Sequence, residues 1–356
     1  MKPDEHQFYL RHFSLAEVGE EGQQRLKQSR ILVIGAGGLG CAALPYLAAA
    51  GIGQLTVCDG DQVELSNLHR QPLYCPKDVG QWKADCAALR CTEQNPWIQV
   101  KGEVGWVTAE NIEEFVQVHD LVLDCTDNPD TNLLIHDACY LSGIPLVAAA
   151  IHRFEGIIHH YEYDHSRQTC KRCLWPDGAM PTGMGDCADR GVIGALPGVF
   201  GILQAQIAIH HLLKIETLPH ATSWIMDLRT MQSRSISWMQ REDCSLCAAH
   251  KTLSLAVLHP HEQDSDIASL EDVGASARLI DIREPEERLI QPISVQLNVE
   301  HKPLSTWNSQ CLEKHQCYVL LCAKGRRSKQ LARKLRLEGY TQIYSLKDGV
   351  DTLIVR

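Results

Sequence analysis

The sequence lacks an excess of positive charge. Its 356 residues contain 34 lysines and arginines against 44 aspartates and glutamates, which gives a formal net charge of −10 at pH 7. Proteins whose main ligand is DNA or RNA usually carry a basic patch or stripe on one face. We therefore expect no nucleic acid among the partners of this protein.

The sequence also lacks a long uninterrupted apolar run. The most apolar stretch, residues 192–215, is interrupted by Pro197 and by polar residues such as Gln204 and His210. A transmembrane helix needs about 20 predominantly apolar residues, so we expect a buried core helix here and no membrane contact. Residues 1–11 are polar and charged, unlike a secretory signal. We therefore expect a cytoplasmic protein.

Cysteine, in contrast, is abundant, with 15 residues in the chain. Disulfide frameworks are typical of secreted proteins, so metal ligands and reactive thiols are the alternatives to consider here. Several cysteines need no special role, because a free cysteine in an apolar or helical run packs as a small hydrophobic residue. These are Cys41, Cys58, Cys86, Cys91, Cys125 and Cys139.

The chain is organised around a glycine-rich loop between a predicted strand and a predicted helix. An apolar run at residues 30–34 leads into Gly-x-Gly-x-x-Gly, and a helix-forming run follows at residues 41–50. This order is the context that the dinucleotide-binding fingerprint requires. The free N–H groups at the start of the helix carry partial positive charge, so we expect a phosphate there. The loop glycines are Gly35, Gly37, Gly38 and Gly40.

The second predicted strand, residues 54–59, ends in Asp59, about 20 residues beyond the loop, which is the spacing of a ribose-binding carboxylate. Adenosine is therefore expected, but NAD and ATP both contain it. Strand-like and helix-like runs alternate as far as residue 150, and residues 154–163 alternate like an antiparallel strand. The pattern predicts an α/β fold, a doubly wound and mainly parallel Rossmann-like sheet with an antiparallel extension.

Residues suited to a magnesium-bound triphosphate follow the first predicted strands. Arg70 and Lys83 supply positive charge, and Asp127, in a turn after the predicted strand 120–125, supplies a carboxylate for Mg²⁺. Cations stabilise the charge that develops when phosphorus is attacked. Taken singly, Asp127 is as well explained by a turn and Arg70 by a surface charge. Their joint position around one glycine loop favours the functional interpretation.

These segments together resemble the MoeB/ThiF family, the bacterial relatives of ubiquitin-activating enzymes. The resemblance covers about residues 5–250 and is carried by residues 35–40, 59–71, 78–83 and 124–128. It implies a homodimeric enzyme that uses Mg-ATP to adenylate the C-terminal glycine of a small ubiquitin-like sulfur-carrier protein ending in Gly-Gly. Molybdopterin synthesis is the expected pathway, and thiamine synthesis is the alternative.

The resemblance also implies roles for individual residues. Asp59 binds the ribose, Lys83 contacts the phosphates and Asp127 holds Mg²⁺. Arg11 occupies the place of an arginine that reaches the ATP of the partner subunit, although from the residues alone a solvated arginine on a leading helix is the simpler interpretation. Asn132 stands where the family usually has an arginine. The other nucleotide contacts implied are Ser66, Asn67, Leu68, His69, Arg70 and Asn128.

Two Cys-x-x-Cys pairs, Cys170 with Cys173 and Cys244 with Cys247, predict a structural zinc site. Four thiolates make a closed tetrahedral set with no position open to water, and the family has the same pairs. The alternative is two independent redox dithiols, but neither pair lies on a thioredoxin-like strand–helix turn.

Cys187 lies in a glycine-rich loop beside Asp186, Asp189 and Arg190. By the resemblance, it occupies the position of a loop cysteine that in some family members forms a thioester or persulfide link to the carrier. Neighbouring carboxylates raise the pKa of a thiol rather than lower it. A spectator thiol is therefore the alternative interpretation of Cys187.

The C-terminal part of the chain predicts a second, smaller α/β domain. We expect an adenylation domain at residues 1–250, a linker at 251–264 and a second domain at 265–356. Cys322 follows a predicted strand and opens a loop that contains Gly325, Arg326 and Arg327 and leads into a basic helix. Backbone N–H groups of such a loop form a cradle for anions, and the arginines and the helix N-terminus favour a thiolate.

This segment resembles a rhodanese domain, in which the loop cysteine carries a persulfide sulfur. The resemblance implies that Cys322 accepts sulfur from a donor such as a cysteine desulfurase and passes it on, so that the carrier becomes a thiocarboxylate. One alternative for this segment is a rhodanese-like domain that only docks partners. One alternative for the whole protein is a nicotinamide-dependent oxidoreductase, but that function gives no role to Arg70, Lys83 and Asp127.

Overall fold

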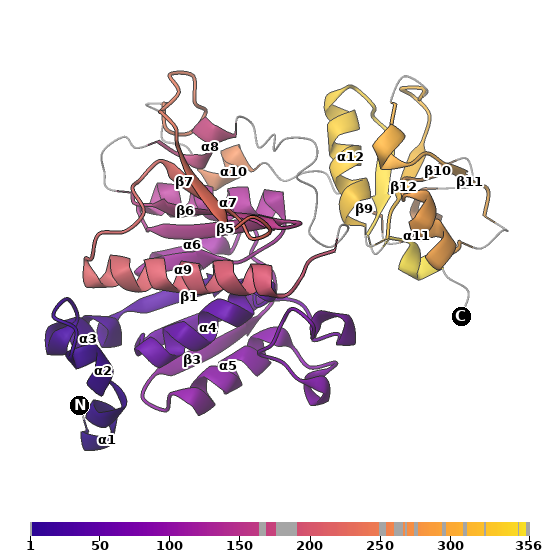
Figure 1. Cartoon of the computed structure of the whole chain (residues 1–356). Helices are drawn as coiled ribbons and strands as arrows, with labels where there is room; N and C mark the ends of the chain where they lie inside the picture. The colour runs from indigo at the N-terminus through magenta and orange to yellow at the C-terminus, as the bar shows by residue number, and fades with distance from the viewer. Residues whose placement is uncertain are drawn as a thin grey trace. The chain divides into compact units, whose positions relative to one another are not determined.

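The computed structural model describes residues 2–163, 169–175, 191–248, 254–259, 266–267, 269–273, 277–293, 297–308, 312–323, 325–347 and 349–353. The chain forms two compact units, Met1–Pro260 and His261–Arg356. Each unit has its own sheet (Figure 1). Each also has its own buried apolar residues. The predicted domain boundaries stay predictions.

An eight-stranded sheet in the order β3-β2-β1-β4-β5-β6-β7-β8 forms the centre of the first unit. The first five of these strands are parallel, and β6, β7 and β8 pair antiparallel. This confirms the predicted parallel sheet with an antiparallel extension. The strands are β1 (Arg30–Ile34), β2 (Gln54–Asp59), β3 (Gln99–Val104), β4 (Leu121–Asp124), β5 (Leu146–His152), β6 (Glu155–Tyr161), β7 (Thr222–Asp227) and β8 (Gln232–Ser237).

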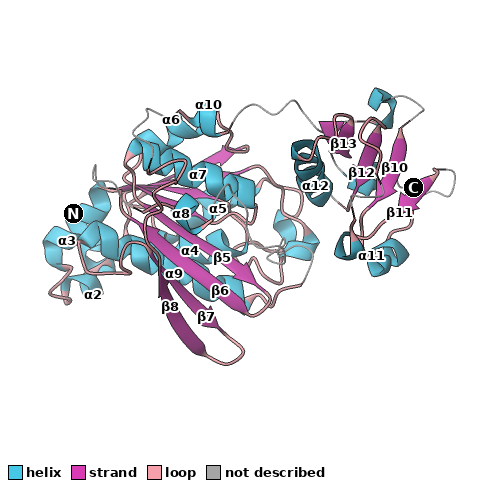
Figure 2. Ribbon diagram, turned by 90° about the horizontal axis from the view of Figure 1, so that it is seen from above, coloured by secondary structure: helices cyan, strands magenta, loops and turns pink. Residues whose placement is uncertain are grey.

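Alternate residues of β1 enter two different cores, one on each face of the sheet. Ile31 and Val33 pack in the first core, whereas Leu32 and Ile34 pack in the second. A parallel strand covered on both faces needs such a continuous apolar run. The strands β7 and β8 project beyond the covering helices (Figure 2), and every residue of β8 is exposed.

The helices of the first unit form the two outer layers. Helix α9 is long and apolar enough to cross a membrane by length and composition alone. It packs against α4 and β5 instead, with Phe200, Ala205 and Ala208 buried in the first core, which confirms the predicted core helix. The helices are α1 (Pro3–Phe8), α2 (Leu10–Phe13), α3 (Gly19–Gln28), α4 (Gly38–Ala50), α5 (Lys83–Gln94), α6 (Ile112–Gln117), α7 (Pro129–Ser142), α8 (Lys171–Leu174), α9 (Ala195–Leu213) and α10 (Leu255–Leu258).

Two segments differ from the expectation. The N-terminal region, where a leading helix was expected at Arg11, forms three helices, and α3 begins only at Gly19, whose φ of +52° is not helical. The expected linker at 251–264 contains α10, which packs against α7 and buries Leu255 in the second core. The helix has only four residues, which is too short for a periodic pattern to predict it.

The second unit is built on a five-stranded parallel sheet in the order β11-β10-β12-β13-β9. Neighbouring residues of β12 enter separate cores: Leu320 packs in one, and Val319 and Leu321 pack in the other. This confirms a second, smaller α/β domain. Its elements are β9 (Asp266–Ile267), β10 (Arg278–Asp281), α11 (Pro285–Ile290), β11 (Val299–His301), β12 (Tyr318–Leu321), α12 (Arg326–Leu337) and β13 (Ile343–Leu346).

Candidate functional site

The glycine-rich loop between β1 and α4 requires glycine at two positions. Gly35 has a φ of +94°, and a Cβ atom there would lie 2.7 Å from the carbonyl oxygen of Cys125. A Cβ atom at Gly40 would lie 2.1 Å from the carbonyl oxygen of Gly35. Gly37 precedes α4 and offers no side chain to cap it. The N-terminus of α4 is therefore suited to an anionic ligand that accepts from its backbone N–H groups.

Asp59, at the end of β2, is hydrogen-bonded to the backbone of this loop. Its Oδ2 accepts from the backbone N–H of Ala36 at 2.7 Å, and its Oδ1 accepts from that of Asp61 at 2.8 Å. Burial raises the pKa of Asp59, although the charge of Lys83 and the two N–H donors act in the opposite direction. Each carboxylate oxygen keeps a further lone pair. Asp59 can therefore still accept a hydrogen bond from a ribose hydroxyl.

Tyr74 and Asp61 fix the position of Lys83. The hydroxyl of Tyr74 lies 2.8 Å from the carbonyl oxygen of Ala36 and 3.3 Å from that of Lys83, which ties the start of α5 to the glycine loop. The buried Nζ of Lys83 donates to Asp61 at 2.9 Å. An ammonium group has three protons, so Lys83 can donate to a phosphate as well. Sequence reasoning missed Tyr74, for which no motif gave a signal.

The predicted phosphate-binding segment, residues 66–70, lies against the glycine loop. A Cβ atom at Gly38 would lie 3.5 Å from the carbonyl oxygen of Arg70. The guanidinium of Arg70 donates to the carbonyl oxygen of Ser66 at 2.9 Å. Asn67 is buried and accepts from a backbone N–H of its own turn, so it shapes the segment. Of the remaining positions, Leu68 packs against the first core and His69 is exposed.

Asp127 lies exposed in the turn between β4 and α7. The next residue, Asn128, caps α7, because its Oδ1 accepts from the backbone N–H groups of Asp130 at 2.9 Å and Thr131 at 3.3 Å. Such a cap fixes the direction in which the turn enters the helix. The role of Asn128 in the structure is thus local, and its contact with a nucleotide stays a prediction.

Asn132 lies buried next to this turn, and its amide donates to the carboxylate of Asp124. Its amide nitrogen lies 2.9 Å from Asp124 Oδ2 and 2.6 Å from Thr126 Oγ1, and Asp124 also accepts from the backbone N–H of Thr126 at 3.0 Å. Burial raises the pKa of Asp124. Asn132 therefore positions the turn that carries Asp127. Sequence reasoning gave no role to Asp124, although it lies in one of the segments that carry the resemblance.

The register of the sheet brings these groups to one edge. Ile34 of β1 lies beside Cys58 of β2 and Asp124 of β4, all in parallel strands. The glycine loop, Asp59 and the turn with Asp127 therefore leave the sheet at the same edge. The strand order reverses between β1 and β4, which is the place where open α/β sheets bind ligands.

Arg11 lies at the opposite edge of the sheet. It is exposed in α2, which packs against α3, and α3 leads into the amino end of β1. Neighbouring Tyr9 accepts a hydrogen bond of 2.7 Å from Asn95, which precedes the amino end of β3. Within one chain, the structure therefore does not bring Arg11 to the glycine loop.

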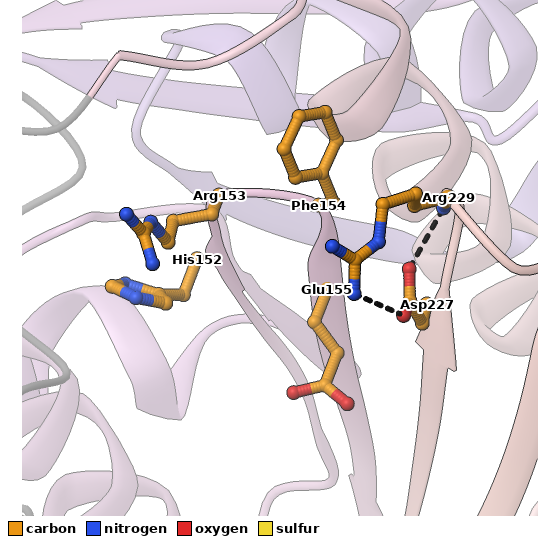
Figure 3. Close-up of a pocket in the computed structure, with 6 residues that line it drawn as sticks. All are labelled: His152, Arg153, Phe154, Glu155, Asp227 and Arg229. Carbon is orange, nitrogen blue, oxygen red and sulfur yellow. Dashed lines mark hydrogen bonds and ion pairs between the residues drawn. The ribbon is translucent and has the colours of Figure 1, made fainter.

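A hollow of about 470 Å³ lies further along the same edge as the glycine loop. Strand β5 pairs with β4 as far as Ala148 and then continues to His152, beyond the carboxyl end of β4. In Figure 3, Arg229 turns toward Asp227, with 3.9 Å between their charged atoms, while His152 and Arg153 lie on the other side of the hollow. The lining residues are His152, Arg153, Phe154, Glu155, Asp227 and Arg229.

The four cysteines predicted to bind zinc form one buried cluster. Their sulfur atoms all lie within 4.8 Å of one another, with 3.5 Å between Cys170 and Cys244 and 3.2 Å between Cys173 and Cys247. Zinc–sulfur bonds of about 2.3 Å in a tetrahedron place sulfur atoms about 3.8 Å apart. The backbone N–H of Arg241 points to the sulfur of Cys173 at 3.4 Å. The cluster fits a structural zinc ion, because it brings the two Cys-x-x-Cys pairs together, which two independent dithiols would not require.

A buried carboxylate supports this cluster from α7. Asp137 accepts from Arg172 at 2.6 Å, and its oxygens lie 2.9 Å from His136 Nδ1 and 2.8 Å from His259 Nε2. Burial raises the pKa of Asp137, but these partners outweigh it, and the pKa is lowered overall. Arg172 lies between two cysteines of the cluster, and His259 directly follows α10, so Asp137 joins three segments. Sequence reasoning missed this network.

Removal of zinc is expected to destabilise the first unit strongly. In Cys173→Ser, we expect zinc bound per chain to fall below half of the wild-type value and Tm to fall by about 6 °C or more, because metal binding contributes folding free energy. Elemental analysis and calorimetric melting measure both. Cys75→Ser, at a half-buried cysteine outside the cluster, is the matched control and should keep its zinc. Full zinc content in Cys173→Ser would contradict the assignment.

Cys322 lies between the end of β12 and the start of α12, as predicted. The backbone N–H of Ser328 points to its sulfur at 3.4 Å, and the hydroxyl of Ser328 lies 3.3 Å from it. Ser328 belongs to the first turn of α12, so the N-terminus of a twelve-residue helix faces the sulfur. Such a position suits an atom that carries negative charge during the reaction. Cys187, by contrast, lies outside the described residues, and its role stays a prediction.

The role of Arg327 in this loop differs from the expectation. The sequence suggested that the loop arginines favour the thiolate of Cys322. Instead, both terminal nitrogens of Arg327 donate to the carboxylate of Glu287 in α11, at 2.9 Å and 2.6 Å. Burial acts to raise the pKa of Glu287, but the hydrogen bonds from Arg327 lower it overall. Arg327 therefore joins two helices, and its charge is neutralised locally.

Comparison with known proteins identifies both units. Residues 9–247 match the ThiF family, and residues 265–353 match the Rhodanese-like domain. The "SAMP-activating enzyme E1" of Haloferax volcanii is 41% identical over 67% of this chain and 87% of its own length. The "Sulfur carrier protein adenylyltransferase" of Thermus thermophilus is 40% identical over 68% of this chain and 91% of its own.

One relative spans both units, and solved structures share the fold of the first. The "Adenylyltransferase and sulfurtransferase uba4" of Emericella nidulans is 30% identical over 94% of this chain and 80% of its own length. The crystal structure of E. coli MccB has a TM-score of 0.59 at 20% identity, covering 70% of this chain and 74% of MccB. A crystal structure of PaaA has a TM-score of 0.56 at 23% identity, covering 68% and 76%.

Proposed function

Because this chain belongs to the ThiF family and continues into a rhodanese-like domain, we propose that it adenylates the C-terminal glycine of a ubiquitin-like sulfur-carrier protein and then transfers sulfur to it. The observation that carries this proposal is the arrangement of the glycine loop, Asp59, Lys83 and the Asp127 turn around one edge of the sheet. Relatives named as adenylyltransferases, one of them also as a sulfurtransferase, support it.

In the first step, a terminal carboxylate oxygen of the carrier attacks the α-phosphorus of ATP. A P–O bond forms, the bond from the α-phosphorus to the bridging oxygen breaks, and pyrophosphate leaves with that electron pair. The nucleophile is already an anion, so no general base is required. This agrees with a site that offers cations and backbone donors instead of a histidine–serine pair.

The residues of the chain then have separate tasks in binding. The N–H groups at the start of α4, together with Lys83 and Arg70, neutralise phosphate charge. Asp59 accepts from the ribose. Mg²⁺ supplies positive charge at the phosphate oxygens when it is bound, and Asp127 is the residue that would hold it. In a homodimer, Arg11 would serve the nucleotide of the partner subunit, which suits its position far from the glycine loop of its own chain.

In the second step, the outer sulfur of a persulfide on Cys322 attacks the acyl carbon of the adenylate. A carbon–sulfur bond forms and AMP leaves, which gives an acyl disulfide. A second thiol attacks the sulfur of Cys322 and releases the carrier thiocarboxylate, while Cys187 is the candidate for a covalent link to the carrier. The resulting disulfide is reduced by an external thiol, and a persulfide donor such as a cysteine desulfurase reloads Cys322. Carriers of molybdopterin synthesis are the expected substrates, and those of thiamine synthesis the alternative.

Calorimetry with two nucleotides tests the proposal against an oxidoreductase. We expect Mg-ATP to bind at micromolar concentration and NAD to bind at least about 100-fold more weakly, because Lys83 and Asp127 match a magnesium-bound triphosphate. ATP–pyrophosphate exchange should then require a carrier with an intact terminal Gly-Gly. A carrier shortened by one glycine is the matched control. Preferential binding of NAD would favour the oxidoreductase.

A further inference from the structure

Three side chains that commonly bind metals meet outside the sites described above. His160 is in β6, Glu162 follows that strand, and His211 lies in the last turn of α9. One ligand atom of each lies within 4.8 Å of the other two. His211 Nδ1 is 3.1 Å and His160 Nε2 is 3.8 Å from the same oxygen, Oε1 of Glu162.

The imidazole of His160 is buried and has the tautomer that a metal ligand needs. Its side chain is 1% exposed, and its Nδ1 lies 3.4 Å from the carbonyl oxygen of Leu218. A carbonyl can only accept, so Nδ1 carries the proton and Nε2 presents a lone pair. Among the described residues, this buried Nε2 has no hydrogen-bond partner. Buried polar atoms without partners are rare in native proteins, and a bound ion can supply the partner that such an atom needs.

The second imidazole of the cluster lies close to the first. The rings of His160 and His211 meet edge to face, with 5.1 Å between their centroids. A cation between the two rings and Glu162 would compensate the carboxylate and give the lone pair of His160 a partner.

We propose that His160, Glu162 and His211 bind a divalent transition-metal ion, with Zn²⁺ as the best fit. Two imidazoles and a carboxylate are a common zinc ligand set. Zinc bonds of about 2.0–2.1 Å in a tetrahedron place ligand atoms about 3.3 Å apart. The two separations from Glu162 Oε1, 3.1 Å and 3.8 Å, lie on either side of this value. Because the side chain of Glu162 is 52% exposed, water fills the fourth position.

This site is separate from the four-cysteine cluster and has a different consequence. Its ligands connect the end of β6 to the end of α9, two elements that pack together in the first unit. Helix α9 also holds the strand edge that bears the nucleotide site, because Gln204 donates to the carbonyl oxygen of Asp124 at 2.7 Å. A metal ion at His211 would therefore stabilise the C-terminal end of α9, the helix that contacts the end of β4 through Gln204.

Zinc titration of the full-length protein, with its cysteine cluster already loaded, tests the proposal. We expect wild type to bind two zinc ions per chain by elemental analysis. In His211→Ala, the second ion should bind at least about 100-fold more weakly, while the first is retained. His210→Ala is the matched control: this neighbouring histidine faces Gln206 and lies outside the cluster, so both ions should remain.

A second measurement distinguishes the new ligands from thiolates. Co²⁺ added to protein that holds zinc in the cysteine cluster alone should give d–d absorption without a sulfur-to-cobalt charge-transfer band, and Glu162→Gln should remove this absorption. Glu162 is half-exposed, so this variant should fold even if His211→Ala does not. Only one zinc ion in wild type, or equal second-site affinity in wild type and Glu162→Gln, would overturn the proposal.

Discussion

Replacement of Asp127 by alanine is expected to lower carrier-dependent ATP–pyrophosphate exchange by about 1,000-fold. Asp127 is the exposed carboxylate at the strand edge that carries the glycine loop. Removing a single group that stabilises transition-state charge commonly costs 10²–10³ in rate, and loss of a magnesium ligand also removes the ion that this carboxylate holds. The measurement is incorporation of labelled pyrophosphate into ATP in the presence of carrier.

The structure offers controls that separate charge from folding. Asp127→Asn keeps the size of the side chain and removes its charge, so it should lose nearly as much exchange as Asp127→Ala. Asp130→Ala removes another exposed carboxylate three residues further along, in the first turn of α7. It should retain exchange within about threefold of wild type, because the substitution removes only a favourable negative charge near the N-terminus of α7. Exchange at the wild-type rate in Asp127→Ala would refute the adenylation site.

Replacement of Cys322 by alanine is expected to abolish thiocarboxylate formation and leave ATP–pyrophosphate exchange unchanged. The sulfur nucleophile is lost, and nothing at the glycine loop is altered, because the two activities belong to separate compact units. Loss of the nucleophile in a covalent pathway typically lowers the rate by 10³-fold or more. Mass spectrometry of the carrier detects the gain of one sulfur in place of one oxygen.

Cys317→Ala is the matched control for this experiment. Cys317 is a half-buried cysteine of the same unit, just before β12, and its replacement should leave the thiocarboxylate yield unchanged. If Cys322→Ala gives the same yield as wild type, the C-terminal unit is a docking module and the sulfur reaches the carrier by another thiol.

The sequence predicted the parts of the molecule whose chemistry is local. The glycine loop, the run that forms β1 and the carboxylate at the end of β2 are neighbours in sequence, and the pattern alone indicates how they fold. The zinc cluster was predictable for a related reason. Each Cys-x-x-Cys pair is a recognisable half-site, and the two halves need only meet.

What the sequence did not predict depends on partners that are distant along the chain. Asp137 joins Arg172 and His259, which lie 35 and 122 residues away. Arg327 pairs with Glu287 across 40 residues. In a single sequence, an aspartate or arginine with a distant partner looks the same as a solvated one. Only the folded structure shows which of these side chains pairs within the chain and which is left to contact a ligand.

The pair formed by Lys83 and Asp61 has a consequence for turnover. A buried ammonium that lost its phosphate ligand would be left uncompensated, and this is costly in a protein interior. Asp61, at 2.9 Å, supplies that compensation without any ligand. If Lys83 contacts the phosphates as proposed, it has an anionic partner before ATP binds and again after pyrophosphate leaves.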